Sequence, residues 1–217
     1  MDKQAVFIYG VAKGSILPES LPLTLKAVTL AHRWHEGHKR DDGSDYVDHL
    51  LSVCNTLLIH RIQDDITLAA SLGHDSKEER GITLEELVDE LGEEVANLID
   101  RVTKRKGESI EEFYGRIKKD IRAIIIKAAD RTHNTGNMIK VYSIERLERY
   151  VKETEEYVLP MMKDARRFYL AYSDALVAFN DHIVDVIKVV KAYVDKSKEC
   201  DNLRKKIKQL KQKSKGV

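Results

Sequence analysis

The sequence has few of the residues that interrupt helices or cross-link chains. It contains 3 prolines and 11 glycines among 217 residues, so long helices are expected. Its 2 cysteines, Cys54 and Cys200, lie far apart and match neither a disulfide framework nor the spacing of a zinc site. No apolar run approaches the roughly 20 residues of a membrane-spanning helix, and the apolar part of the N-terminus is short for a signal peptide. We therefore expect a reduced, cytoplasmic protein with no membrane contact.

The sequence also lacks a charge excess of either sign. Its 37 basic and 36 acidic residues leave a net charge of +1, which excludes a global attraction to nucleic acid or membranes. Charged residues make up 34% and apolar residues 42%, a composition typical of globular proteins with exposed polar helix faces. The length suits one well-buried domain, or one domain with an extension.

Apolar residues recur at intervals of three and four through most of the chain, and no stretch alternates as a strand would. The pattern predicts an all-α protein. We expect an N-terminal arm over residues 1–20, a helical domain over residues 21–178, and a C-terminal helix with a basic tail over residues 179–217.

Local signals place several helix boundaries. Capping boxes at Thr83 and Ser109 mark two helix starts. The helix that begins after Ser109 is expected to continue through the almost wholly apolar segment 121–129, which is typical of a central, buried helix. Pro160 is expected to break or kink the helical run around it.

The C-terminal tail is basic. Residues 204–215 carry seven lysines and arginines and no acid. Such a segment suits an electrostatic contact with RNA or pairing with a partner helix, and a solvated terminal helix has the same composition. The sequence leaves these alternatives open, as it leaves open whether the protein is a monomer or a homo-oligomer.

A histidine lies directly beside an aspartate, as His74 and Asp75, at the end of an apolar run. Two further acids, Glu78 and Glu79, follow within about one helical turn. Acids so close repel one another unless a positive charge joins them, and His with Asp suits divalent first-row metals. For an isolated pair a solvated helix end is the commoner interpretation, so the metal hypothesis needs partners elsewhere.

Two such partners lie at or near the ends of other expected helices. Asp130 ends the most apolar helix, where an unpaired carboxylate is costly, although Arg131 could neutralise it instead. If the helices pack antiparallel, His49 and Asp130 converge on His74 and Asp75. Two histidines and two aspartates around one ion leave room for water, as in a catalytic rather than a closed structural site. Such an ion lowers the pKa of that water.

Further charged residues have two interpretations each. On the turn next to the metal, Glu78 or Glu79 could orient the water or take its proton, or both could form ordinary surface pairs. Residues 32–40 are rich in histidine, lysine and arginine. They suit a polyanionic phosphate substrate, or form an ordinary polar helix face.

The order of His49, then His74 with Asp75, then Asp130 resembles the HD-domain metal-dependent phosphohydrolases. The resemblance is strongest to the (p)ppGpp hydrolase domain of RelA/SpoT-type proteins and to stand-alone small alarmone hydrolases. The segment at residues 124–134, Ile-Ile-Ile-Lys-Ala-Ala-Asp-Arg-Thr-His-Asn, is the most specific match. The other segments that carry it are residues 31–49, 68–79, 91–104 and 153–160.

The resemblance implies an HD-domain helical bundle with an extra C-terminal helix. It implies a Mn²⁺-type divalent ion, with Glu78 and Glu79 serving the attacking water. The implied metal ligands are His49, His74, Asp75 and Asp130.

The resemblance also implies a nucleotide polyphosphate substrate of the stringent response. The implied reaction is hydrolysis of the 3′-pyrophosphate of (p)ppGpp, giving GDP or GTP and pyrophosphate. No synthetase half is expected within the 217 residues. The implied nucleotide contacts are Lys39, Arg40, Asn134 and Met138.

Several residues depart from the family pattern around the nucleotide. Asp41 and Asp42 stand where the family has a lysine and a small polar residue, Glu79 replaces an aspartate, and residues 135–138 differ after Asn134. Two added acids would repel phosphate but could accept hydrogen bonds from a different base or sugar. The alternatives are another nucleotide or a 3′-phosphorylated or pyrophosphorylated RNA end, and, in another class, a non-catalytic metal-binding interaction protein.

Overall fold

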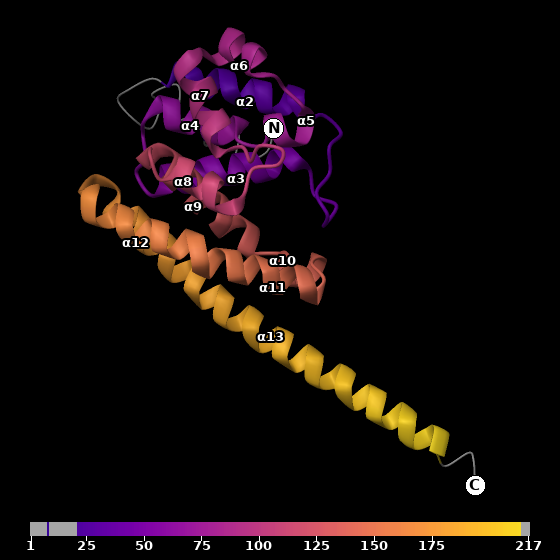
Figure 1. Cartoon of the computed structure of the whole chain (residues 1–217). Coiled ribbons are helices and arrows are strands. Elements are labelled where there is room, and N and C mark those ends of the chain that lie inside the picture. Colours follow the sequence, from indigo (N-terminus) through magenta and orange to yellow (C-terminus); the bar gives the residue numbers. More distant parts are fainter. Residues whose placement is uncertain (1–7, 9–20, 214–217) are drawn as a thin grey trace.

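The computed structural model describes residue 8 and residues 21–213, and this part of the chain contains helices and no strand. The prediction of an all-α protein is confirmed. Short helices form a bundle, and one long C-terminal helix runs along one side of the bundle and beyond it (Figure 1). No helix within the described ranges combines the length and the apolar character needed to cross a bilayer.

The elements follow one another with short connections, apart from a loop between α2 and α3 that carries the basic segment. In chain order they are α2 (Pro22–Trp34), α3 (Tyr46–Ile59), α4 (Asp65–Gly73), α5 (Ser76–Arg80), α6 (Leu84–Leu91), α7 (Glu93–Val102), α8 (Ile110–Ile117), α9 (Ile121–Thr135), α10 (Met138–Val141), α11 (Ile144–Glu153), a π-helical segment (Thr154–Val158), α12 (Leu159–Phe168), a 3₁₀ turn (Leu170–Tyr172) and α13 (Ser173–Lys213).

Two helices form the centre of the core. Residues 67–73 of α4 are all buried, and α9 is buried over most of its length and packs against α3, α4, α7 and α13. At the end of α4, a Cβ atom added to Gly73 would lie 2.7 Å from Ile99 Cδ1. The absence of a side chain at Gly73 therefore lets α4 approach α7 closely, immediately before His74.

The predicted helix boundaries are partly confirmed. Both capping boxes are present, at Thr83 and Ser109. The prediction of one continuous helix from Ser109 to Ala129 is wrong, because α8 ends at Ile117 and α9 begins at Ile121. Asp120 starts α9 as its N-cap, since its carboxylate accepts a hydrogen bond from the backbone N–H of Arg122. Ahead of Pro160, the helical run is interrupted by the π-helical segment.

Two parts of the expected division of the chain can be compared with the structure. The expected boundary between residues 178 and 179 falls inside α13. The inner face of this helix, with Ile183, Ile187 and Val190, belongs to the same core as the bundle. The N-terminal arm expected over residues 1–20 lies outside the described residues, apart from Ile8, which is buried.

A buried arginine ties α9 to its neighbours. Arg131 Nη2 donates to Glu153 Oε1 at 2.6 Å and to the Tyr114 hydroxyl at 3.0 Å, and Nη1 donates to Thr154 Oγ1 at 3.1 Å. Its guanidinium carbon also lies 4.1 Å from the centre of the Tyr150 ring. Arg131 therefore joins α9 to α8 and α11, and it does not neutralise Asp130.

We expect Arg131→Met to destabilise the fold by about 2–3 kcal/mol, because it leaves the half-buried Glu153 carboxylate without its partner. The free energy of unfolding in urea, followed by circular dichroism, measures this. Arg149→Met is the matched control, since Arg149 is exposed on α11, and its effect should stay below about 0.5 kcal/mol. Equal effects at the two positions would contradict the structural role of Arg131.

Candidate metal centre and the adjoining cavity

Three buried side chains from three helices converge on one point. His49 lies in the first turn of α3, His74 directly follows α4, and Asp130 lies in α9. The Nε2 atoms of the two histidines are 3.3 Å apart. Asp130 Oδ1 lies 3.3 Å from His49 Nε2 and 3.6 Å from His74 Nε2. Asp75 adds a fourth oxygen, because its Oδ2 lies 3.5 Å and 3.3 Å from the same two nitrogens.

The spacing of these atoms fits a divalent metal ion. Coordination bonds of about 2.1 Å place neighbouring ligand atoms roughly 3.0–3.5 Å apart, in octahedral and tetrahedral arrangements respectively. His49, His74 and Asp130 each have one ligand atom within 4.8 Å of those of the other two. Asp75 is less buried, with 18% of its side chain exposed. The structure thus brings the four predicted ligands together, and the donor set suits a borderline metal.

The charge state of the carboxylates also suits ligation. Burial raises the pKa of the Asp130 carboxyl, but the Lys127 ammonium and hydrogen bonds from His49 and His74 outweigh this and hold the pKa well below its usual range. Lys127 Nζ lies 2.6 Å from Asp130 Oδ2, which leaves Oδ1 for the cluster. Asp130 is therefore ionised and has one oxygen directed at the metal position.

Both histidines are oriented by their second ring nitrogen. His74 Nδ1 lies 2.7 Å from the carbonyl oxygen of Ser71, which can only accept, so Nδ1 carries a proton and Nε2 is the ring nitrogen directed at the cluster. His49 Nδ1 lies 2.8 Å from His133 Nδ1. Burial lowers the pKa of His133 to about 4, so its neutral ring can accept the Nδ1–H of His49. Sequence reasoning missed this role of His133.

The two predicted catalytic acids lie on α5, directly after Asp75. Glu79 lines the cavity beside the cluster, and its Oε2 lies 3.8 Å from His38 Nε2. Glu78 is exposed overall, although its carboxyl is partly desolvated, and it is not among the described residues that line the cavity. Burial and the negative charge of Asp75 raise the pKa of the Glu78 carboxyl. The structure thus places one acid in the cavity and the other in the field of Asp75.

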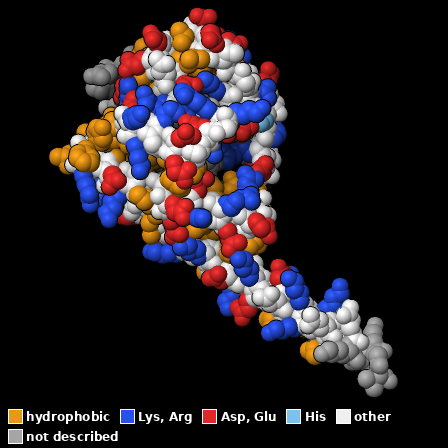
Figure 2. Space-filling model, in the orientation of Figure 1, with side chains coloured by type: hydrophobic (Ala, Val, Ile, Leu, Met, Phe, Trp, Pro, Cys, Tyr) orange, Lys and Arg blue, Asp and Glu red, His pale blue; other side chains and the backbone are white. Residues whose placement is uncertain are grey.

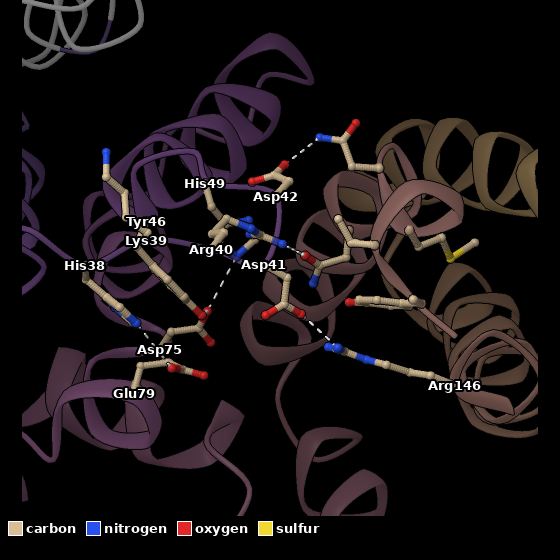
Figure 3. Close-up of a pocket in the computed structure, with 15 residues that line it drawn as sticks. His38, Lys39, Arg40, Asp41, Asp42, Tyr46, His49, Asp75, Glu79 and Arg146 are labelled. Carbon is tan, nitrogen blue, oxygen red and sulfur yellow. Dashed lines mark hydrogen bonds and ion pairs between the residues drawn. The ribbon is translucent and has the colours of Figure 1, made fainter. Parts of the chain in front are cut away.

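A cavity of about 270 Å³ opens beside the cluster (Figure 3). It reaches from His49 and Asp75 on one side to α10 and α11 on the other. Its lining is predominantly polar and includes all four predicted nucleotide contacts, Lys39, Arg40, Asn134 and Met138, together with Tyr46, Tyr142 and Arg146.

One hydrogen-bonded chain joins this cavity to the cluster. Arg40 Nη2 donates to Asn134 Oδ1 at 2.6 Å, and Asn134 Nδ2 donates to Asp130 Oδ1 at 2.7 Å. Near Arg40, the Tyr46 hydroxyl donates to Asp75 Oδ2 at 2.7 Å. A ligand that contacts Arg40 would therefore be two hydrogen bonds from a proposed metal ligand.

The two acids that depart from the family pattern both have partners. Asp41 Oδ2 forms an ion pair with Arg146 Nη1 at 2.8 Å, and Arg146 stacks 3.6 Å from the centre of the Tyr142 ring. Asp42 accepts hydrogen bonds from Asn137 Nδ2 at 3.1 Å and from the Ser44 hydroxyl at 2.6 Å. The charge of Asp41 is thus balanced across the cavity mouth, so the predicted repulsion of phosphate is weaker than the sequence suggested.

Sequence reasoning missed several residues of the site, and only some had a signal. Tyr46 lies three residues before His49, and Lys127 three before Asp130, so each shares a helix face with a predicted ligand. Arg146 lies 105 residues after its partner Asp41 in the sequence, and no local pattern connects them.

The described residues thus form an all-helical domain in which two histidines and two aspartates point at one position beside a polar cavity. This arrangement is typical of helical domains that bind a divalent metal. The model of the HD-domain family matches residues 27–158, which is more than half of the chain. The chain therefore belongs to the HD-domain family.

Known relatives match this chain over only part of their own length. A probable GTP pyrophosphokinase of Mycobacterium leprae is 35% identical over 151 residues, which are 65% of this chain and 19% of the relative. A guanosine-3′,5′-bis(diphosphate) 3′-pyrophosphohydrolase of Haemophilus influenzae is 33% identical over 143 residues, 61% of this chain and 21% of the relative. The chain thus spans about a fifth of the length of these curated relatives.

A solved structure of a metazoan ortholog of SpoT, a protein that hydrolyzes ppGpp and plays a role in starvation responses, has the same fold. It is 20% identical to this chain, with a TM-score of 0.60. The match covers 76% of this chain and 94% of that one. At this identity the likeness establishes the HD-type helical fold alone.

We expect His133→Ala to weaken Mn²⁺ binding by about 10- to 100-fold, because His49 loses the acceptor that orients its ring. His133→Gln keeps an acceptor and should recover much of the affinity. Isothermal titration of the metal-free protein with Mn²⁺ measures both. His32→Ala, at an exposed histidine of α2, is the control and should bind as wild type does. Unchanged affinity in His133→Ala would show that His49 needs no such partner.

Proposed function

We propose that the protein is a metal-dependent phosphohydrolase that removes the 3′-pyrophosphate of guanosine 3′,5′-bis(diphosphate) or its triphosphate analogue, releasing GDP or GTP and pyrophosphate. The observation that carries the proposal is the cluster of His49, His74, Asp75 and Asp130 beside a cavity with Arg40 and Asn134 in its wall. The activity for which the relative from Haemophilus influenzae is named supports this substrate. Other relatives are named for GTP pyrophosphokinase activity, and the match to the HD-domain family favours hydrolysis for the shared region.

The four clustered side chains would hold a divalent ion such as Mn²⁺. When bound, such an ion would polarise a phosphoryl oxygen as a Lewis acid, and it would also lower the pKa of a bound water molecule toward neutrality. The chain itself prepares the site for the ion. His133 orients the ring of His49, the Ser71 carbonyl orients the ring of His74, and Asp130 is ionised.

The acids of α5 act on the water. Glu79 faces the cavity and takes a proton as the water oxygen attacks the phosphorus that is bonded to ribose O3′. The bond from that phosphorus to O3′ breaks, O3′ takes up the proton held by Glu79 and becomes the 3′-hydroxyl, and the pyrophosphate leaves as the product. Glu78, with a pKa raised by desolvation and by Asp75, is the second acid that the family resemblance assigns to the water, and it would act from beside the cavity rather than from its wall.

The nucleotide would be held by the opposite wall of the cavity. The Arg40 guanidinium, 5.7 Å from the centre of the Tyr46 ring, is suited to a charge-assisted contact with phosphate oxygens. Lys39 adds a second positive charge at the rim, Asn134 lies toward the ribose, and buried Met138 supplies an apolar contact. A cytoplasmic location is part of the proposal, and both cysteines are free, as expected in a reducing compartment.

Purified protein with Mn²⁺ should release pyrophosphate from ppGpp, and chelation of the metal or His74→Ala should abolish this. Glu79→Gln should lower kcat by about 10²- to 10⁴-fold while Mn²⁺ affinity stays near that of wild type. Other nucleotides and an oligonucleotide with a 3′-phosphate, assayed in parallel, test the alternative substrates. Mn²⁺ binding without turnover of any of these compounds would favour the interaction protein instead.

Arg146→Ala should raise KM for ppGpp by about 3- to 10-fold, because it leaves the Asp41 carboxylate unpaired at the cavity mouth. Asp41→Asn added to Arg146→Ala removes the unpaired charge and should restore most of the loss. Steady-state kinetics of the two single variants and the double variant measure the coupling. If the double variant is as impaired as Arg146→Ala, then Arg146 contacts the nucleotide directly rather than through Asp41.

A further inference from the structure

The last part of α13 projects away from the bundle. Lys198 Nζ binds Glu148 Oε1 of α11 at 2.5 Å, and every residue from Glu199 to Gln212 is exposed. Residues 199–213 therefore extend about 22 Å beyond this contact, at 1.5 Å per residue. Figure 1 shows this projection, and Figure 2 shows apolar side chains scattered along it among the basic ones.

The projecting segment is the continuation of a packed helix, which supplies its nucleation, but the segment itself has no tertiary packing within the described residues. The local ion pairs, such as Lys196 with Glu199 at 2.8 Å and Arg204 with Asp201 at 3.1 Å, are solvated and contribute little. A helix that packed along the projection would supply the tertiary contacts that these residues lack.

The projection carries one ordered apolar stripe. Leu203, Ile207 and Leu210 are 51%, 52% and 66% exposed, and their spacing of four and three continues backwards to Cys200, Lys196, Tyr193 and Val189. Val189 and Tyr193 are likewise 60% and 42% exposed. From Val189 to Leu210 the positions alternate by four and three for about three heptads, with Lys196 as the one charged residue among them, and this spacing is the pattern of a coiled-coil seam.

This stripe is not the face that packs on the bundle. The core-facing stripe of α13 ends at Val194, which is 5% exposed. Leu203 follows nine positions later, which is about two and a half turns, so the two side chains lie on opposite sides of the helix. A second helix can therefore lie along the outer stripe without displacing α11 or α12.

We propose that the outer stripe of α13 pairs with the same stripe of a second copy of this chain, in an antiparallel coiled coil. In the register that uses every seam position from 193 to 210, Cys200 packs beside the partner's Leu203. Tyr193 packs beside the partner's Leu210, and Lys196 beside the partner's Ile207. The pairing is two-fold symmetric, so each of these contacts occurs twice.

Charge selects the antiparallel direction. In a parallel pair, Lys196 would face its own copy inside the seam, and Lys206 would flank the partner's Lys211, so like charges meet at both levels. In the antiparallel register, Lys196 faces an isoleucine and Lys206 flanks the partner's Glu199. The basic segment that starts at Arg204 then lies along the part of the partner that contains Asp195, Glu199 and Asp201.

The oligomeric state of the full chain tests the proposal first. Sedimentation at micromolar concentration should give twice the 24.9 kDa chain mass. Leu203→Glu combined with Ile207→Glu should give the monomer. Gln209→Glu combined with Gln212→Glu adds the same charge on the same exposed helix but outside the stripe, and this control should remain a dimer. None of the described residues that line the cavity beside the metal cluster lies on α13, so both double variants should bind Mn²⁺ as wild type does.

Disulfide trapping tests the direction and gives a positive signal. In a Cys200→Ser background the remaining Cys54 is fully buried. Lys196→Cys and Ile207→Cys proteins should each fail to cross-link alone under mild oxidation, because like positions lie roughly 16 Å apart along the axis. An equal mixture of the two should form disulfide-linked dimers.

Three results would overturn the proposal. A monomeric wild-type protein would do so, and so would efficient cross-linking of either single-cysteine protein alone, which indicates a parallel pair. A monomer that binds single-stranded RNA, with the binding lost on truncation after Lys198, would assign the basic tail to RNA instead.

Discussion

The buried carboxylate of Asp130 is the constraint on which the site depends. It lies within the buried helix α9, where an unpaired negative charge would be strongly unfavourable. Lys127 binds one of its oxygens, while Asn134 and the two histidines surround the other. Because these partners come from α3, α4 and α9, the folding of the bundle and the assembly of the candidate metal centre are one event.

The same carboxylate connects the metal position with the cavity. Asn134 binds both Asp130 and Arg40, so the loop after α2 is joined to α9 through a polar contact that a substrate phosphate could compete for. Charge balance extends to the cavity mouth, where Arg146 offsets Asp41. The proposed anionic ligand is therefore compatible with the cavity, even though the chain carries more acid around the cavity than the resemblance leads one to expect.

Residues close in sequence, or joined by helical spacing, were predictable. The helical class follows from apolar periodicity, and the capping boxes follow from a Ser or Thr three residues before a Glu. The convergence of His49, His74, Asp75 and Asp130 was expected from an assumed antiparallel packing together with the family resemblance. Contacts made only in three dimensions were not predictable, as the ion pair of Asp41 with Arg146 shows. The break between α8 and α9 was missed because apolar spacing continues across it, while a single N-cap at Asp120 ends the continuity.

The long helix α13 shows how one sequence can carry two hydrophobic patterns in one element. Ile183, Ile187, Val190 and Val194 form a stripe that faces the core, and Leu203, Ile207 and Leu210 form one that faces away. In the sequence the two sets look like one amphipathic run interrupted by polar residues 195–202. In the structure that segment is where the apolar face changes sides, and the outer stripe has already begun at Val189. A solvated terminal helix needs no second stripe in unbroken heptad spacing, so the pattern itself argues for a partner.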